Sequence, residues 1–184
     1  MEQITVNDLL SKNLRGKIIC FPTDTIYGVG ALYDDEVAID KIYQMKKRKI
    51  DKPLAILTPT SDIDKYVENI SEEAQNLIDK FWPGPLTLIF KKSSIISESL
   101  TRGLSTIAFR MPNSQIALTI LNQFGPMATT SVNISGSKEL NTITDITASF
   151  SDYLDYLIID KEVLTLSPSK VIDVSGNKSK IIRN

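Results

Sequence analysis

The sequence predicts one α/β domain over residues 1–184, built on an open, twisted sheet of mixed parallel and antiparallel strands flanked by helices. Three observations predict this class. Short apolar runs alternate with segments of helical periodicity early in the chain. Two short runs at the carboxyl end flank Ser175-Gly176-Asn177-Lys178, which is typical of an antiparallel hairpin. The length of 184 residues suffices for one packed core and is short for two.

The first half of the chain is predicted to alternate helices and strands. We expect helices over residues 4–14, 35–45 and 71–81, and strands over residues 17–21, 53–57 and 86–90. Asp34 or Asp35 can cap the second helix and Ser71 the third, because their side-chain oxygens accept hydrogen bonds from the first free amides of a helix. Trp82-Pro83-Gly84-Pro85 ends the third helix, since proline cannot continue it.

The second half is predicted to hold mainly strands. We expect strands over residues 105–109, 127–130, 156–159, 170–174 and 180–183, and a helix over 114–124. Gly125-Pro126 stops that helix. Residues 138–152 are polar and poorly patterned, so we expect a loop with one turn of helix. The chain shows no repeat, low-complexity tract or linker, which favours one domain.

The chain has no histidine and one cysteine, Cys20. It therefore excludes a Ser-His-Asp triad, a Cys-His pair and an intrachain disulfide. We expect no zinc, haem or nicotinamide, and any metal would be a Mg²⁺-type ion with oxygen ligands. Cys20 is expected to be a small buried hydrophobe. No apolar run approaches a membrane span and no secretory signal is recognisable, so we expect a cytoplasmic protein without a membrane partner.

Positive charge is concentrated in residues 46–52, Lys-Lys-Arg-Lys-Ile-Asp-Lys. This segment has five positive charges and one negative, a net +4, so the other residues carry −5 of the total −1. Cations at a helix end stabilise it modestly, which is one explanation. A bound compact anion is another, and it also explains five charges directly before a buried strand. No P-loop is present, so a polyphosphate would be held differently from a P-loop nucleotide.

Small polar groups cluster where apolar strands or a helix end. The sets are Thr23/Thr25, Lys46/Arg48/Lys52, Thr106/Arg110 and Ser131/Asn133. Open α/β sheets place ligands at the carboxyl ends of strands, and residues two apart share one face of extended backbone. Arg110 is a candidate clamp for a substrate carboxylate, although it can also bridge a surface acid. The hydroxyl and amide side chains can also serve turns alone.

Six segments together resemble the YrdC-type family of threonylcarbamoyl-AMP synthases, including its single-domain members. They are KIICFPTDTIYGVGA, KKRKIDKPLAIL, WPGPLTLIF, STIAFRMP, TSVNISG and the closing SKVIDV with IIR, in order between residues 17 and 183. The resemblance implies a YrdC-like fold and a nucleotidyltransferase that joins L-threonine, bicarbonate and ATP. Pyrophosphate is released, and the product is threonylcarbamoyl-adenylate for N6-threonylcarbamoyladenosine modification of tRNA. It also implies a tRNA-modifying transferase complex as partner and leaves a weak RNA contact open.

The resemblance assigns two sets of binding residues. L-Threonine would be held by Thr25, Arg110, Ser131 and Ser169. ATP would be held by Lys46, Arg48, Lys52, Thr106, Asn133, Asn141 and Arg183, with Lys46 and Arg48 as the catalytic pair and Mg²⁺ brought by ATP. No side chain stands out as a general base, and Asp24 is equally suited to caging or to Mg²⁺. A structured-RNA-binding module, or an enzyme for another carbamoyl-type substrate, are the alternatives.

Four positions depart from the family pattern. Lys47 replaces the glycine of the usual Lys-Gly-Arg, and Val132 replaces the alanine of Ser-Ala-Asn. Lys170 follows Ser169 where the family has a Ser-Thr pair. The family often has a histidine after the second strand, and this chain has none there, near Leu57. None of these departures removes the candidate anion-binding residues Lys46, Arg48 and Arg110.

Overall fold

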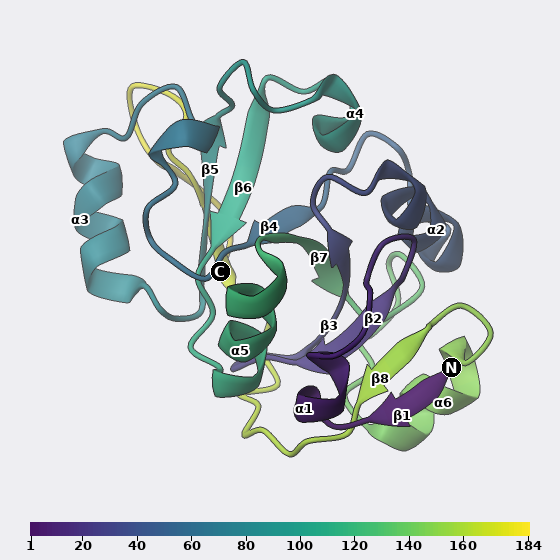
Figure 1. Cartoon of the computed structure of the whole chain (residues 1–184). Coiled ribbons are helices and arrows are strands. Elements are labelled where there is room, and N and C mark those ends of the chain that lie inside the picture. Colours follow the sequence, from purple (N-terminus) through teal and green to yellow (C-terminus); the bar gives the residue numbers. More distant parts are fainter.

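The computed structural model describes residues 1–184, and ten strands form a single sheet (Figure 1). The strands are β1 (Glu2–Ile4), β2 (Ile19–Pro22), β3 (Tyr27–Leu32), β4 (Ala55–Leu57), β5 (Leu86–Lys91), β6 (Thr106–Arg110), β7 (Met127–Ser131), β8 (Tyr156–Ile158), β9 (Lys170–Asp173) and β10 (Lys180–Arg183). The helices are α1 (Val6–Leu9), α2 (Glu36–Lys46), α3 (Glu72–Phe81), α4 (Glu98–Thr101), α5 (Gln115–Phe124) and α6 (Ile143–Phe150), with a 3₁₀ turn at Asp64–Tyr66.

The sheet mixes strand directions, as the sequence predicted. Its order is β1-β8-β2-β3-β7-β4-β6-β5-β9-β10. Strand β8 runs parallel to β1 and β2, β4 is parallel to β6, and β5 is parallel to β9. The other neighbouring pairs are antiparallel, including the terminal β9–β10 hairpin. The predicted fold class is therefore confirmed.

Two helix starts have the predicted caps, since the side chains of Asp35 and Ser71 accept hydrogen bonds from backbone amides in the first turns of α2 and α3. Ser114 and Thr142 do the same for α5 and α6, which was not predicted. No helix is long and apolar enough to cross a membrane, and the longest, α2, has 11 residues.

Four expectations for secondary structure were wrong. Residues 4–14 form a four-residue helix, α1, that follows the edge strand β1. Strand β3 was not expected, because Gly28 and Gly30 weaken any strand signal. Helix α4 was also missed, and the predicted loop at 138–152 contains the eight-residue helix α6. Helix α6 forms in a poorly patterned segment because Ile146 and Phe150 are buried in the larger core.

The two faces of the sheet bury separate apolar cores. The larger core has 33 residues and includes Ala38, Ile42 and Met45 of α2 together with Val29 of β3. The smaller core has 11 residues and packs α1 and α5 against the other face (Figure 1). Alternation along β2 separates them, since Cys20 belongs to the larger core and its neighbours to the smaller. Helix α5 covers only part of the sheet face on which it packs, and the candidate site lies on the uncovered part of that face.

Gly30 is required by the close approach of β7. A Cβ at this position would lie 2.9 Å from Thr129 Oγ1 and 3.2 Å from the Ala128 carbonyl oxygen. We expect Gly30→Ala to lower the free energy of unfolding by about 1–3 kcal/mol, the usual cost of overpacking, in urea titrations. Gly176→Ala is the matched control, because its Cβ would meet only one atom, at 3.8 Å. Equal effects of the two changes would show that β7 yields to the added methyl group.

Candidate active site

A pocket of about 460 Å³ lies on the sheet face that α5 leaves open. Its floor is a row of small residues in register across the strands, Thr129 of β7, Ala55 of β4 and Ala108 of β6. Because these side chains are short, the floor is recessed between polar walls. The walls carry four cations and two acids, namely Arg48, Lys52, Arg110, Arg183, Asp51 and Glu139. The pocket therefore has excess positive charge and suits an anionic ligand.

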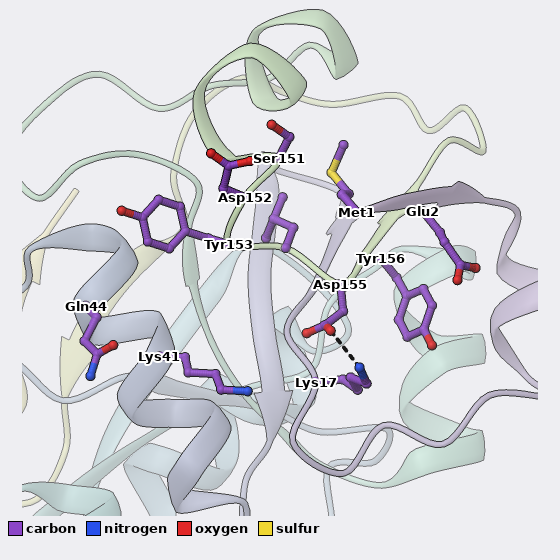
Figure 2. Close-up of a pocket in the computed structure, with 11 residues that line it drawn as sticks. Met1, Glu2, Lys17, Lys41, Gln44, Ser151, Asp152, Tyr153, Asp155 and Tyr156 are labelled. Atoms are coloured by element: carbon purple, nitrogen blue, oxygen red, sulfur yellow. Dashed lines mark hydrogen bonds and ion pairs between the residues drawn. The ribbon is translucent and has the colours of Figure 1, made fainter.

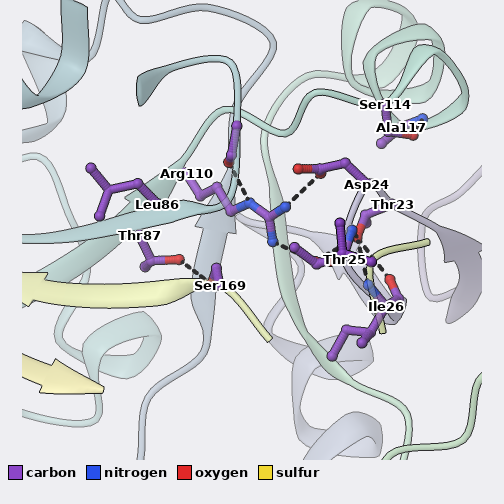
Figure 3. A network of polar contacts seen from close by, with 12 residues as sticks. Thr23, Asp24, Thr25, Ile26, Leu86, Thr87, Arg110, Ser114, Ala117 and Ser169 are labelled. Carbon is purple, nitrogen blue, oxygen red and sulfur yellow. Dashed lines mark hydrogen bonds and ion pairs between the residues drawn. The ribbon is translucent and has the colours of Figure 1, made fainter. Parts of the chain in front are cut away.

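Arg110 is the most buried cation of this pocket, with 6% of its surface exposed. Its Nε donates to the Gly84 carbonyl (3.0 Å). Its Nη1 donates to Thr25 Oγ1 (2.9 Å) and Nη2 to Asp24 Oδ1 (2.5 Å), as Figure 3 shows. Burial lowers the pKa of Arg110, and the Asp24 carboxylate opposes that shift. A guanidinium has five N–H donors, so one on each terminal nitrogen is still free. Two such donors match the two oxygens of a carboxylate.

The Pro-Thr-Asp-Thr segment forms a tight turn between β2 and β3. The Thr23 amide donates to the Ile26 carbonyl (3.2 Å), so the backbone is not extended through Thr25 as the shared-face argument required. The two threonines still meet, with their hydroxyl oxygens 3.0 Å apart. The turn, rather than strand alternation, brings them together. It also directs Asp24 and Thr25 onto Arg110 (Figure 3).

The segment of residues 160–168 holds this turn through backbone hydrogen bonds. The Thr165 amide donates to the Asp24 carbonyl (3.1 Å), and the Leu166 amide donates to the Thr25 carbonyl (2.9 Å). Glu162 accepts a hydrogen bond from the Ser114 hydroxyl at the start of α5 (2.9 Å). The position of Arg110 is therefore fixed through two layers of contacts.

Lys46 points beneath the pocket wall and does not line the pocket. It is 1% exposed, and its ammonium donates to the Ser131 carbonyl (2.5 Å), the Asn133 carbonyl (2.9 Å) and Asn133 Oδ1 (2.6 Å). Burial lowers the pKa of Lys46 to about 8, repulsion from Arg48 adds to this, and Glu139 opposes it. All three N–H donors are occupied by one loop. Lys46 therefore fixes the loop that carries Ser131 and Asn133.

The remaining charges of residues 46–52 diverge after the helix. Helix α2 ends at Lys46, within one residue of the predicted end. Lys47 is in the left-handed region at φ 48°, which favours glycine and explains why glycine is usual at this position. Lys47 and Lys49 are exposed, whereas Arg48 and Lys52 line the pocket. Arg48 is held by the Lys52 carbonyl (2.8 Å) and the Pro53 carbonyl (3.0 Å).

The opposite wall of the pocket is formed by β5, β9 and β10. Arg183 donates to the Ser169 carbonyl from Nε (2.9 Å) and from Nη2 (2.7 Å), and Nη2 also lies 3.3 Å from Ser169 Oγ. The Ser169 and Thr87 hydroxyl oxygens are 2.8 Å apart. Burial lowers the pKa of Arg183, and Glu139 opposes the shift. Two guanidinium groups, those of Arg110 and Arg183, thus line one pocket together with Ser169.

Comparison with known proteins gives the family. The Sua5/YciO/YrdC family, described as telomere recombination, matches residues 12–184. The chain belongs to this family. It is 37% identical over 162 residues to the threonylcarbamoyl-AMP synthase of Pyrococcus abyssi, covering 87% of this chain and 48% of that enzyme. A relative from Methanocaldococcus jannaschii is 35% identical over 184 residues, covering 99% of this chain and 86% of the relative.

A solved family structure has the same fold. The crystal structure of P. abyssi Sua5 complexed with L-threonine matches with a TM-score of 0.91 and 32% identity. The match covers 100% of this chain and 57% of that one. The chain thus spans about half the length of the P. abyssi protein, and the recognised resemblance to the YrdC-type family is confirmed.

The pocket brings together seven of the eleven residues that the family resemblance assigned. They are Thr25, Arg48, Lys52, Arg110, Ser131, Ser169 and Arg183. Four others do not line it. Lys46 and Asn133 lie behind the wall, Asn141 Oδ1 accepts from the Tyr27 amide (3.0 Å), and Thr106 begins β6, about 13 Å along the strand from Arg110. Direct ligand contact stays a prediction for all eleven residues.

Thr87 was missed by the sequence reasoning, although it is buried and lines the pocket. Its one sequence signal is a polar residue inside the apolar run Leu86–Phe90. Leu57, near which the family often has a histidine, lies on the apolar floor beside Arg110 in register. Leu57 therefore contributes no titratable group to the pocket floor next to Arg110.

A larger cavity of about 620 Å³ lies near the amino terminus, between α2 and the segment after α6 (Figure 2). None of the eleven predicted residues lines it. Its two lysines are engaged within the protein, since Lys17 forms an ion pair with Asp155 at 2.8 Å and the Lys41 ammonium donates to the Gly16 carbonyl. The smaller pocket is therefore the candidate active site.

No group of three or more His, Cys, Asp or Glu side chains is placed to hold a metal ion. The two acids of the pocket, Asp51 and Glu139, come from separate loops. Asp24, considered for Mg²⁺ from the sequence, is ion-paired with Arg110. Such scattered carboxylates do not form the set of convergent oxygen ligands that holds a divalent cation in proteins.

Proposed function

We propose that this chain is a threonylcarbamoyl-AMP synthase, which converts L-threonine, bicarbonate and ATP to threonylcarbamoyl-adenylate and pyrophosphate. The observation that carries the proposal is that four cations line one pocket. Arg110 offers two free donors for a carboxylate, while Arg48, Lys52 and Arg183 supply charge for phosphates. The names of the relatives support the same reaction.

The reaction has two steps. The threonine amine first adds to bicarbonate and water leaves, which gives a carbamate. A carbamate oxygen then attacks the α-phosphorus of ATP, and the bond to the bridging oxygen of the pyrophosphate breaks. Such transfers depend mainly on positioning and on charge stabilisation. Arg48 and Lys52 would neutralise the charge that builds on the pyrophosphate, and Mg²⁺ bound to ATP would add to this.

In this proposal each substrate has its own position in the pocket. Arg110, fixed by Asp24 and Thr25, orients the threonine carboxylate. Asp24 is committed to Arg110, so it is not free to act as a general base. The small residues of the floor leave room for the nucleotide between the cationic walls. The product is a reactive mixed anhydride, which a transferase complex would pass on to tRNA.

The test is release of pyrophosphate from ATP by the purified chain. Release should require both L-threonine and bicarbonate, and the adenylate should be detected by mass spectrometry. Release that is independent of threonine would refute the proposal. Salt-dependent binding of structured RNA without any such release would instead support the RNA-binding alternative.

Arg48→Gln should separate the two substrates. We expect the KM for ATP to rise about tenfold or more, because a charged hydrogen bond to phosphate is lost, while the KM for threonine stays unchanged. Lys49→Gln is the matched control, since this neighbouring cation is exposed and does not line the pocket. An equal rise in both variants would mean that only the overall charge of the segment matters.

A further inference from the structure

Thr87 lies directly beside Arg110 on the pocket face of the sheet (Figure 3). In the antiparallel β5–β6 pair, Leu88 is opposite Phe109 and Ile89 is opposite Ala108. The next pair along this register is Thr87 and Arg110. Side chains paired in this way have Cβ atoms about 5 Å apart on one face. A ligand whose carboxylate is bound by Arg110 therefore has the Thr87 hydroxyl within reach of its side chain.

The hydroxyls of Thr87 and Ser169 have hydrogen-bonding capacity that the protein leaves unused. The pair shares one hydrogen bond of 2.8 Å, and Ser169 Oγ also accepts from Arg183. Two hydroxyls have two hydrogens and four lone pairs between them. One hydrogen and two acceptor positions are left, on side chains that are 5% and 6% exposed. A ligand hydroxyl, which both donates and accepts, fits this remainder.

Thr25 has no free hydrogen to donate, although its hydroxyl is also close to Arg110 and keeps one lone pair. Thr23 Oγ1 donates to the Ile26 carbonyl (2.7 Å), so within the threonine pair the hydrogen must come from Thr25. Thr25 Oγ1 also accepts from Arg110 (2.9 Å). Its single hydrogen is therefore used inside the protein. Thr25 fixes Arg110 and is not available to donate to a substrate hydroxyl.

We propose that Thr87, paired with Ser169, determines specificity by binding the side-chain hydroxyl of a β-hydroxy amino acid held on Arg110. This inference rests on the proposed function and specifies how the site selects its amino acid. Valine has the shape of threonine but no hydroxyl, so it would leave the buried Thr87–Ser169 pair unsatisfied. Sites that hydrogen-bond a substrate hydroxyl reject analogues lacking it much more strongly than apolar pockets reject a change of size.

Thr87→Val and Thr87→Ser test this with little change in volume. We measure kcat/KM for pyrophosphate release with threonine and with valine for each variant. In Thr87→Val we expect the threonine value to fall about tenfold or more relative to that for valine. Thr87→Ser keeps the hydroxyl and should keep the wild-type preference. Ser169→Ala is a second variant that should lower the same ratio if Thr87→Val does not fold.

The ratio of the kcat/KM values for threonine and valine distinguishes substrate recognition from a purely structural role, in which the Thr87–Ser169 hydrogen bond only joins β5 to the segment before β9. If Thr87→Val lowers both values equally, or leaves the preference for threonine unchanged, the proposal is overturned. Binding supplies a readout that does not depend on catalysis, namely the rise in melting temperature caused by each amino acid. Absence of pyrophosphate release from wild type would refute the proposed function alone. Equal stabilisation of wild type and Thr87→Val by threonine would refute the specificity proposal alone.

Discussion

Replacing Arg110 by glutamine is expected to lower kcat/KM for threonine about 100-fold, and to lower the free energy of unfolding by about 3 kcal/mol. Both effects follow from the burial of the guanidinium, which binds the Gly84 carbonyl, Thr25 and Asp24. Removing it leaves the Asp24 carboxylate, itself 14% exposed, without its ion-pair partner. Steady-state pyrophosphate release and urea unfolding measure the two effects.

A double variant separates the two consequences. Arg110→Gln/Asp24→Asn removes both charges, so much of the lost stability should return. Activity should not return, because the carboxylate-binding donors are still missing. Arg110→Lys keeps the charge but not the fork, and should bind threonine weakly. Recovery of threonine-dependent activity in the double variant would show that Arg110 serves only to neutralise Asp24.

Much of the fold followed from local signals along the chain. Capping by Asp35 and Ser71 was predictable, because each accepts hydrogen bonds from the helix that immediately follows it. Strand β3 was not predictable. Its glycines give no strand signal, and it forms because β2 and β7 pair on either side of it. The pairing with β7 joins residues about one hundred positions apart in sequence, which local patterns do not record.

The candidate site was likewise only partly predictable from local sequence. The residue types at strand ends predicted a site that includes Arg110 and Ser131, and both residues line the same pocket. The direction of each side chain was not predictable, because it depends on where a helix or turn ends. Residues within the Lys-Lys-Arg-Lys segment diverge after the left-handed residue Lys47. Thr87 was missed since its role depends on the register of β5 with β6.

Lys46→Met is expected to lower the free energy of unfolding by about 2–3 kcal/mol and to raise the KM for ATP. The ammonium is the donor for the Ser131 carbonyl and for two oxygens of Asn133. Methionine has a similar length but no donors, so these acceptors lose their partner and the loop shifts at the pocket wall. Lys47→Met is the control, since that neighbouring side chain is exposed. A raised KM without any loss of stability would indicate direct contact between Lys46 and ATP.

The pH dependence of this variant tests the burial of Lys46 independently. The pKa of Lys46 is lowered from its ordinary 10.5 to about 8 in the folded protein. Between these values the unfolded chain binds more protons at this residue, so its contribution to the free energy of unfolding increases with pH. The stability difference between wild type and Lys46→Met should therefore grow from pH 7 to pH 10 in urea titrations. A difference that stays constant over this range would mean that the three hydrogen bonds hold the proton against burial, because a lysine with a folded-state pKa at or above 10.5 is protonated in both states up to about pH 10.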